Sequence, residues 1–509
     1  MRLVGAAEMR AIDEAAIRGL GIPGMRLMEA AGTAVAAHAV ALAPRGRIRV
    51  VCGAGNNGGD GYVAGRILHA AGREVEALAL VPLAKLAGDA RQAREEAARA
   101  GLPIRDLADA GAILAAPGEL LVDALLGTGL SRAPDGLFLA AIERLRALRA
   151  AGARVLAVDV PSGLSADTGR PPGACVEADR TVTFAFPKRG LLLHPGAALA
   201  GEVAVADIGI PPEAAARVPV ACELLGEKEA RALVPPRAPD AHKGDAGRLL
   251  VIAGSPGKSG AAHLALAGAL RGGAGLVTLA ARDEVLPLAL AGRPEAMSLP
   301  LPGNGPLARG DLAPLLEAAR GSDALVVGPG IPRGPETAGL LRDLLAAARL
   351  PAVLDADALN ALAGSREGVA GLPAPAVVTP HPGEMARLCA TDVAAVQADR
   401  IGLAAERARA WGCVVVLKGA RTVVADPAGA PALVSSGNAG MASGGTGDVL
   451  AGLVGALLAG GLDARAAARA GAWVHGRAGD LAAQRHGQRG LLAADLADAV
   501  GQVWAAWGR

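Results

Sequence analysis

The chain has 509 residues, of which 51 are Lys or Arg and 49 are Asp or Glu, so its formal net charge is only +2. This near balance argues against a nucleic-acid-binding or membrane-surface protein, because such proteins usually carry a basic patch. Hydrophobic residues make up 52% and charged residues 20% of the chain. It is therefore too apolar for a disordered protein and long enough for two to four domains.

The sequence predicts a cytoplasmic protein. No uninterrupted apolar stretch reaches the ~18 residues of a membrane helix. Glu8, Asp13 and Glu14 stand where a signal peptide would be apolar. Five cysteines, none in a CxxC pair, predict reduced buried thiols and neither disulfides nor a zinc site. They are Cys52, Cys175, Cys222, Cys389 and Cys413.

The first 200 residues alternate short apolar runs with helix-like segments, which predicts a mostly parallel, doubly wound α/β sheet. The expected strands are 47–53, 74–81, 120–127 and 154–163, and the expected helices are 62–72, 85–101 and 137–152. The pattern weakens after residue 212, where two Pro-Pro pairs disfavour helix. A domain boundary is expected near residue 220.

The second half repeats the α/β pattern. Its expected strands are 248–255, 276–281, 324–330, 352–357, 376–380 and 414–419. We expect two domains, 1–215 and 222–509, the first a Rossmann-like three-layer α/β/α domain. Ligands of such sheets bind beyond the carboxyl ends of the strands, so the loops there are the candidate sites.

The run GAGNNGGDG (53–61) follows the first strand. Its glycines allow close backbone approach to a ligand, and the next helix would direct its N-terminus at an anion. A plain Gly/Asn turn is the alternative. Two later strand-end loops, VDALLGTGLSR (122–132) and VDVPSGLSADTG (158–169), should converge on it. Asn57, Asp123 and Ser162 could together bind one cation, which leaves Asp159 free for proton transfer.

A second Gly-rich turn, GNAGMASGGTGDVLAG (437–452), leads into an apolar helix. The backbone N–H groups of 445–447 could form an anion hole, and Asp448 in the first helical turn could take a proton from an attacking hydroxyl. A helix-capping Asp is the alternative. His381, between two prolines, and Lys418 end later strands. Their alternatives are a core histidine and a solvated lysine.

The N-terminal motifs GNNGGDG, GTGLSR and DVPSG resemble the NAD(P)HX epimerase domain over about residues 1–215. NAD(P)HX is hydrated NAD(P)H, with water added at C6 of the ring. The resemblance implies potassium at Asn57, Asp123 and Ser162, and it places Lys188 of FPKRG near the site. It implies NADPHX contacts at Asn56, Asn57, Gly58, Gly59, Asp60, Gly127, Thr128, Gly129, Leu130, Ser131, Arg132, Ala133 and Asp159.

The C-terminal motifs HKGDAG, AGSPGKSGA, GPGI, HPGE, KGART and GGTGDVLAG resemble the ADP/ATP-dependent NAD(P)HX dehydratases of the ribokinase-like superfamily over about residues 222–509. The loop 253–260 departs from many relatives by having Pro256, Gly257 and Lys258 where an aromatic residue is expected. The resemblance implies NADPHX contacts at Ala261, Gly330, His381 and Asp448. It implies ADP contacts at Lys418, Gly419, Ala420, Arg421, Thr422 and Gly447.

The two resemblances together imply a bifunctional repair enzyme. It would epimerise R- and S-NAD(P)HX at Asp159 and dehydrate the S form at Asp448 at the expense of ADP, giving AMP and phosphate. K⁺ and Mg²⁺ are the expected ions, a homo-oligomer is the expected assembly, and nucleic acid and membrane are not expected partners. Three alternatives stay open: a small-molecule kinase, a non-catalytic nucleotide- or RNA-binding module, and a chain with one active domain.

Overall fold

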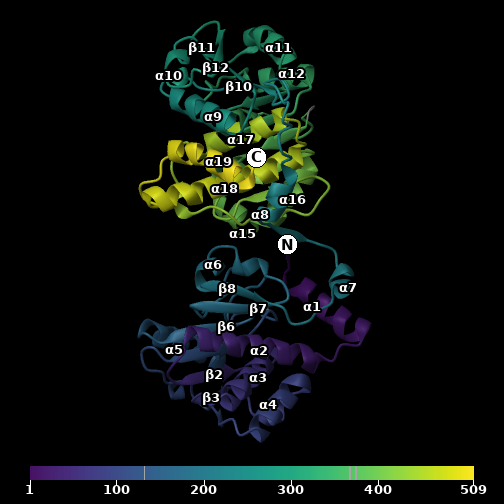
Figure 1. Cartoon of the computed structure of the whole chain (residues 1–509), viewed down its shortest axis with the longest axis vertical. Coiled ribbons are helices and arrows are strands. Elements are labelled where there is room, and N and C mark those ends of the chain that lie inside the picture. The colour runs from purple at the N-terminus through teal and green to yellow at the C-terminus, as the bar shows by residue number, and fades with distance from the viewer. Residues whose placement is uncertain (131, 366–367, 373–374) are drawn as a thin grey trace. The chain divides into compact units, whose positions relative to one another are not determined.

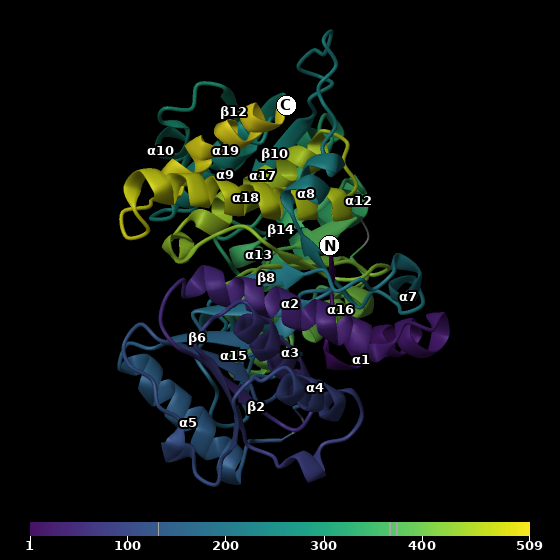
Figure 2. The same cartoon turned by 60° about the horizontal axis from the view of Figure 1, so that its bottom comes forward.

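The computed structural model describes residues 1–130, 132–365, 368–372 and 375–509. The chain forms two compact units, Arg2–Ala221 and Cys222–Arg509, the latter together with Met1. Figures 1 and 2 show the first unit in purple and blue and the second in teal to yellow. Within the described ranges no helix has the length and apolar character needed to cross a membrane. All five cysteines are free, and all but Cys389 are buried.

The first unit is built on a seven-stranded parallel sheet in the order β4-β3-β2-β5-β6-β7-β8. The chain runs outward from β2 through β3 to β4, then returns to the other side of β2 as β5. The carboxyl ends of β2 and β5 therefore flank the switch point where ligands bind in such sheets. The strands are β2 (Ile48–Cys52), β3 (Val75–Ala79), β4 (Ile104–Asp106), β5 (Leu120–Ala124), β6 (Arg154–Val158), β7 (Arg180–Phe184) and β8 (Glu202–Ala206).

Helices cover both faces of this sheet, which makes the unit three-layered. On one face Val50 packs with Tyr62 and Val63, whereas on the other Val51 packs with Ile142 and Leu145. Figure 2 shows strands β2 and β6 between α5 on one side and α2 to α4 on the other. The helices are α1 (Ala6–Glu14), α2 (Gly24–Leu42), α3 (Asn56–Ala70), α4 (Gly88–Arg99), α5 (Gly136–Ala150), α6 (Gly196–Leu199) and α7 (Pro212–Ala216).

The prediction that a helix starts at residue 62 is wrong, because α3 already begins at Asn56. Three glycines of the GNNGGDG run lie inside the helix, where glycine costs roughly 0.5–1 kcal/mol relative to alanine. Close packing explains them. A Cβ on Gly58 would lie 2.2 Å from the Gly53 carbonyl oxygen, and one on Gly61 would lie 2.6 Å from the Ala124 Cβ.

The second unit has its strands in the order β9-β18-β17-β16-β15-β14-β13-β10-β11-β12. All neighbours are parallel except the β16-β17 and β17-β18 pairs, a meander that the sequence did not predict. Here the switch point lies between β10 and β13. The strands are β9 (Cys222–Leu225), β10 (Arg248–Ile252), β11 (Leu276–Arg282), β12 (Ala296–Leu301), β13 (Ala324–Val327), β14 (Ala352–Leu354), β15 (Ala376–Val378), β16 (Val414–Leu417), β17 (Val423–Ala425) and β18 (Ala432–Val434).

Four helices bury their apolar faces against this sheet in one core: α9 (Ser259–Arg271), α17 (Thr446–Ala459), α18 (Ala464–His486) and α19 (Ala493–Trp507). Helices α9 and α17 lie side by side (Figure 1), and a Cβ on Gly452 would lie 1.9 Å from the Ala265 carbonyl oxygen. This close backbone contact fixes the position of α17 along α9. The remaining helices are α8 (Glu227–Leu233), α10 (Leu286–Leu290), α11 (Leu312–Arg320), α12 (Thr337–Ala348), α13 (Ala356–Ala363), α14 (Pro382–Leu388), α15 (Val393–Ala398) and α16 (Arg400–Trp411).

Candidate active sites

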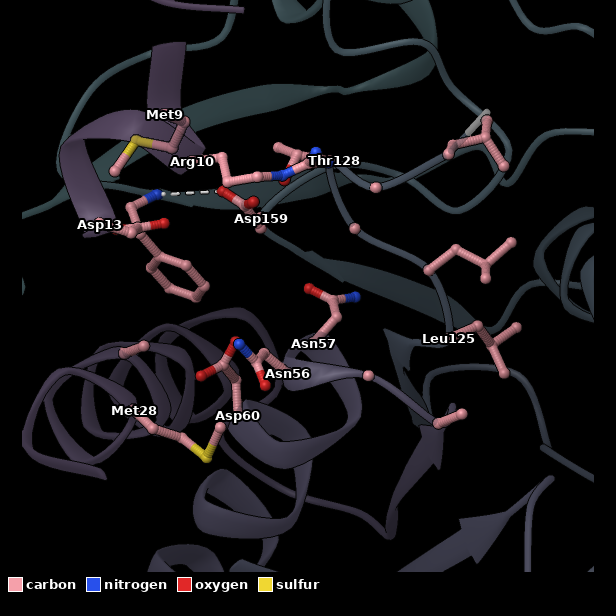
Figure 3. Close-up of a pocket in the computed structure, with 18 of the residues that line it drawn as sticks. Met9, Arg10, Asp13, Met28, Asn56, Asn57, Asp60, Leu125, Thr128 and Asp159 are labelled. Atoms are coloured by element: carbon pink, nitrogen blue, oxygen red, sulfur yellow. Dashed lines mark hydrogen bonds between the residues drawn. The ribbon is translucent and has the colours of Figure 1, made fainter. Parts of the chain in front are cut away.

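A pocket of about 660 Å³ opens at the switch point of the first unit (Figure 3). Helix α1, the N-terminal parts of α2 and α3, and the loops after β5 and β6 form its walls. Most of the residues expected to contact substrate line it: Asn56, Asn57, Asp60, Gly127, Thr128, Gly129, Leu130, Arg132, Ala133 and Asp159. Ser131 lies outside the described residues. The other two expected contacts, Gly58 and Gly59, face neighbouring parts of the protein. Gly58 packs on Gly53, and a Cβ on Gly59 would lie 2.6 Å from Met28 Cε.

Asp159 follows β6 with a φ of 63°, a left-handed backbone that few non-glycine residues adopt. Its Oδ1 accepts hydrogen bonds from Lys188 Nζ at 2.5 Å, Thr183 Oγ1 at 3.0 Å and the Phe184 N–H at 3.3 Å. Lys188 is 1% exposed and also donates to the Phe184 carbonyl at 2.9 Å. A strained backbone and a buried ion pair thus hold one carboxylate at the pocket wall.

Two further carboxyl groups line the same pocket, Asp60 of α3 and Asp13 of α1. Burial, and secondarily the negative charges of Asp159 and Asp13, raise the pKa of Asp60 well above its usual value. Burial raises the pKa of Asp13 to about 6, although Lys188 opposes the shift. Asp13 was not predicted as a site residue, because it stands in a helical segment with no glycine-rich motif around it.

Asp123 and Ser162 are fully buried and hydrogen-bonded to each other. The Ser162 Oγ donates to Asp123 Oδ1 at 2.6 Å, and its N–H donates to Asp123 Oδ2 at 2.8 Å. Burial raises the pKa of Asp123 to about 6. In the ranges described, no basic side chain pairs with Asp123. Asn57 approaches from α3, and its Nδ2 is buried without a hydrogen-bond partner there.

In the second unit, the Gly-rich turn places Asp448 in the first turn of α17, as predicted. Gly445 caps the helix with a φ of +91°, a conformation that favours glycine. The neighbouring Thr446 carbonyl contacts His475 Nε2 at 2.8 Å. Burial lowers the pKa of His475 to about 4, so the ring is neutral and Nε2 donates. This hydrogen bond from His475 of α18 holds the Gly-rich turn in place.

The environment of Asp448 is rich in carboxylates. Lys418 Nζ bonds to Asp355 Oδ1 at 2.6 Å and lies 3.9 Å from Glu384 Oε2. The same ammonium lies 3.1 Å from the position of a Cβ on Gly447. Burial and the charges of Asp355 and Glu384 raise the pKa of Asp448 to about 7, against the opposing effect of Lys418. Asp355 and Glu384 were not singled out from the sequence, since neither lies in a Gly-rich turn.

His381 caps α14 and is not a core histidine. Its Nδ1 accepts the Gly383 N–H at 3.0 Å, and Glu384 returns the contact by accepting the His381 N–H at 2.8 Å. Because Nδ1 accepts, the neutral ring carries its proton on Nε2. The side chain is 51% exposed, so it is open to a ligand. Burial and the Lys418 charge lower its pKa.

The loops at the β10/β13 switch point contact each other. A Cβ on Gly330 would lie 3.0 Å from the Ala261 Cβ and 3.1 Å from the Lys258 Cβ. Lys258 Nζ and Arg333 Nε each lie 2.9 Å from one oxygen of Asp357. The cation at Lys258 therefore stands where an aromatic residue was expected, beside the two residues predicted to contact substrate.

The loop 418–422 is anchored by Arg400 at the start of α16. Its Nη2 donates to the carbonyls of Leu417, Lys418 and Arg421 at 3.1, 3.2 and 3.4 Å. Gly419 has a φ of +141°, and its Cβ position lies 3.0 Å from the Arg400 guanidinium. The carbonyls of the loop are thus turned to Arg400. Ala420 is exposed, and Thr422 Oγ1 donates to the Gly419 carbonyl at 3.4 Å.

Two family models match the chain in the order of its units. Residues 24–190 match the model described as YjeF-related protein N-terminus, and residues 249–502 match NAD(P)H-hydrate dehydratase. The second unit also resembles the crystal structure of the ADP/ATP-dependent NAD(P)H-hydrate dehydratase from Bacillus subtilis co-crystallised with ATP/Mg²⁺. The TM-score is 0.50 at 32% identity, over 56% of this chain and 98% of that one. The fold class of the second unit is therefore ribokinase-like α/β, as predicted.

Relatives match both units at once. The bifunctional NAD(P)H-hydrate repair enzyme Nnr of Moorella thermoacetica is 44% identical over 98% of this chain and 96% of its own length. The proteins of the same name in Thermofilum pendens and Escherichia coli are 39% and 38% identical, over 97% and 88% of this chain and 95% and 83% of their own lengths. This chain belongs to the family of bifunctional NAD(P)H-hydrate repair enzymes.

Proposed function

We propose that the chain repairs hydrated nicotinamide cofactors with both of its units: the first epimerises R- and S-NAD(P)HX, and the second dehydrates the S form to NAD(P)H. The observation that carries the proposal is the presence in one chain of two complete switch-point sites. In one, Asp159 is held by Lys188 in the 660 Å³ pocket. In the other, Asp448 begins a helix behind a Gly-rich turn. Both sites join an ionisable carboxyl group to an anion-binding backbone.

In the second unit Asp448 takes the proton of the C6 hydroxyl, whose oxygen attacks the terminal phosphoryl group of ADP. AMP is released in this transfer. The phosphorylated oxygen then leaves C6 as phosphate and a C5 proton is lost, which restores the ring double bond. The N–H groups of 445–447 would stabilise the charge on the transferred group. Ala261 and Gly330 approach the substrate from the β10/β13 loops, and His381 can donate from Nε2. Lys418, Gly419, Ala420, Arg421, Thr422 and Gly447 are the proposed ADP contacts.

Mg²⁺ fits this site as a companion of the nucleotide. No group of three His, Cys, Asp or Glu side chains in the described ranges could hold a metal alone. Magnesium usually binds one or two carboxylates together with substrate phosphates. Asp355 and Glu384, which flank Lys418, are the carboxylates that would hold it there. Held by Asp355 and Glu384, Mg²⁺ would supply positive charge that neutralises the transferred phosphoryl group.

Lys418 also supports a prediction about nucleotide affinity. Changing Lys418→Met removes the ammonium that would contact phosphate, and it leaves the buried Asp355 carboxylate unpaired. We expect the KM for ADP to rise roughly 10- to 100-fold, as for a lost charged contact of ~1.5–3 kcal/mol. The measurement is the ADP dependence of NADH formation. An unchanged KM for ADP would place the nucleotide elsewhere, and the matched variant Lys258→Met should leave that KM near the wild-type value.

We propose potassium at Asn57, Asp123 and Ser162. These residues offer carboxylate, hydroxyl and amide oxygens, the donors that hard cations prefer. The cation would also balance the buried charge of Asp123. Because the Asn57 Nδ2 has no hydrogen-bond partner among the described residues, this amide could present its oxygen to the cation.

Replacing K⁺ by tetramethylammonium should lower the epimerase rate at least tenfold. The effect should vanish in Asp123→Asn, which lacks the charge that K⁺ would balance. The same loss of rate in both proteins, or no loss in the wild type, would contradict a site at Asp123. Thermal unfolding gives an independent reading, because a ligand of the native state raises Tm in the wild type alone.

We further propose that the protein is cytoplasmic and a homo-oligomer. Strand β8 is an open edge of the first sheet and carries Val205, which is 43% exposed. Open edges are common sites of chain association. Light scattering of the purified chain would decide the state.

The proposed dehydratase is tested with purified S-NADHX, Mg²⁺ and either ADP or ATP. The expected result is NADH, followed by its near-ultraviolet absorbance, with one AMP and one phosphate formed per NADH from ADP. Turnover of ADP without NADH, or phosphorylation of an unrelated alcohol in its place, would favour a small-molecule kinase. Tight binding of the nucleotide with no turnover of either compound would favour a binding module.

A further inference from the structure

The pocket of the first unit contains more carboxyl groups than cations at its centre. Asp159, Asp60 and Asp13 influence one another electrostatically, and among the residues that the structure describes Lys188 is the cation that lowers the pKa of Asp60 and Asp13. Lys188 bonds to Asp159. In the part of the chain that the structure describes, no donor reaches the carboxyl oxygens of Asp13 or Asp60. Burial and neighbouring negative charges both favour the protonated form of a carboxyl group, so Asp60 is the group of this site that keeps a proton.

Asp159 and Asp60, which differ most in their hydrogen-bond partners, lie on different walls of the pocket (Figure 3). Asp159 enters from the loop after β6, and Asp60 enters from the first turns of α3 on the opposite side, beside Asn56. One oxygen of Asp159 accepts hydrogen bonds from the Lys188 ammonium, the Thr183 hydroxyl and the Phe184 N–H. Burial and the negative charges of Asp159 and Asp13 raise the pKa of Asp60, and the charge of Lys188 opposes this shift without cancelling it.

We propose that Asp60 and Asp159 are a two-sided acid–base pair that exchanges the C6 hydroxyl between the two faces of the ring. This inference rests on the epimerase function proposed above and assigns Asp60 a catalytic role besides binding. Protonated Asp60 gives its proton to the hydroxyl on one face, and the C6–O bond breaks to release water. The N1 lone pair forms the C6–N1 double bond of an iminium ion.

A water molecule then adds to C6 from the other face. The new C6–O bond forms, the electron pair returns to N1, and carboxylate Asp159 takes the proton of the incoming water. One water leaves and one enters, so the atoms balance and the configuration inverts. Asp60 ends as carboxylate and Asp159 as acid, which is the arrangement for the reverse direction. Asp13 is a positioning residue here, because its charge raises the proton affinity of Asp60.

Two changes separate these roles. Asp60→Asn has the shape and neutrality of the protonated acid but no proton to give, so we expect the fold to persist and the epimerase rate to fall ~10²- to 10⁴-fold, the range of general acid catalysis. Asp13→Asn leaves the Asp60 carboxyl group in place but removes a negative neighbour of Asp60. The alkaline limb of the epimerase pH profile, where Asp60 loses its proton, should then move to lower pH. The other charged groups lining the pocket are Arg10, Asp89, Arg132 and Asp135.

The deciding experiment uses the full chain with nucleotide withheld, so that the dehydratase is idle. R-NADHX is equilibrated in ¹⁸O-water, and mass spectrometry follows the label in the S epimer, with an enzyme-free sample as the blank. We expect one heavy oxygen in each S molecule formed. Inversion without label in the wild-type reaction, or a wild-type rate in Asp60→Asn, would overturn the pair. Absence of any inversion by the wild type would instead overturn the epimerase function, and thermal unfolding of each variant shows whether the first unit is folded.

Discussion

Replacing Asp448 by Asn is expected to lower dehydration of S-NADHX by ~10²- to 10⁴-fold, the usual contribution of a positioned general base. Asn keeps the size of the side chain at the first turn of α17 but cannot accept the hydroxyl proton. The measurement is NADH formation at saturating ADP. A rate within a few-fold of wild type would contradict the base role. Epimerisation by the first unit serves as the control in the same protein and should not change.

The stability of this variant separates catalysis from folding. Burial raises the pKa of Asp448 from 3.8 to about 7, so this group lowers the stability of the fold increasingly as pH rises from about 4 to about 7 and lowers it most above that range. Asp448→Asn should therefore be at least as stable as wild type at pH 8 while nearly inactive. The wild-type dehydratase rate should rise as pH increases through about 7, since the base must be ionised. Loss of this rise is expected in any variant that removes the Asp448 carboxylate.

Replacing Asp159 by Asn is expected to have two large effects at once. The epimerase loses the carboxylate that exchanges a proton with substrate, so its rate should fall ~10²- to 10⁴-fold. The buried Lys188 ammonium also loses its counter-charge, and breaking a buried pair from one side typically costs about 3–5 kcal/mol. The backbone conformation should persist, because Asn tolerates the left-handed φ of 63°. Thermal unfolding and the inversion of R-NADHX measure the two effects.

A double-mutant cycle assigns the two effects to their causes. Lys188→Met alone leaves the Asp159 carboxylate buried without its partner, and it should be destabilised as well. The double variant, Asp159→Asn with Lys188→Met, has no buried charge at this position and should recover much of the lost stability. Its epimerase should stay inactive. Recovery of activity together with stability would mean that Asp159 serves only to hold the fold.

Strand-end loops carried most of what could be predicted from the sequence. Because parallel strands end at one edge of a sheet, the loops with Asp159, His381 and Lys418 were expected near the Gly-rich turns. Side chains from helices without a motif could not be found in this way. Asp13, which reaches the first site from α1, is such a side chain. Glu384 does belong to the HPGE motif, but its contacts with the His381 N–H and Lys418 appear only in the structure.

The start of α3 was missed for a different reason. Local propensity places GNNGGDG in a loop, whereas packing against Gly53 and Ala124 leaves space only for glycine and makes the segment helical. The meander β16 to β18 was missed because β17 and β18 are three-residue strands, too short to show a period. Tertiary contact decided both segments, and a single sequence does not display it.

The most direct test of the bifunctional account is the fraction of NADH recovered from an equal mixture of R- and S-NADHX supplied with Mg²⁺, K⁺ and ADP. Two active sites in one chain predict recovery from the whole mixture, faster than the R epimer converts without enzyme. Recovery from the S epimer alone would contradict the account, because the pocket around Asp159 would then have no epimerase activity.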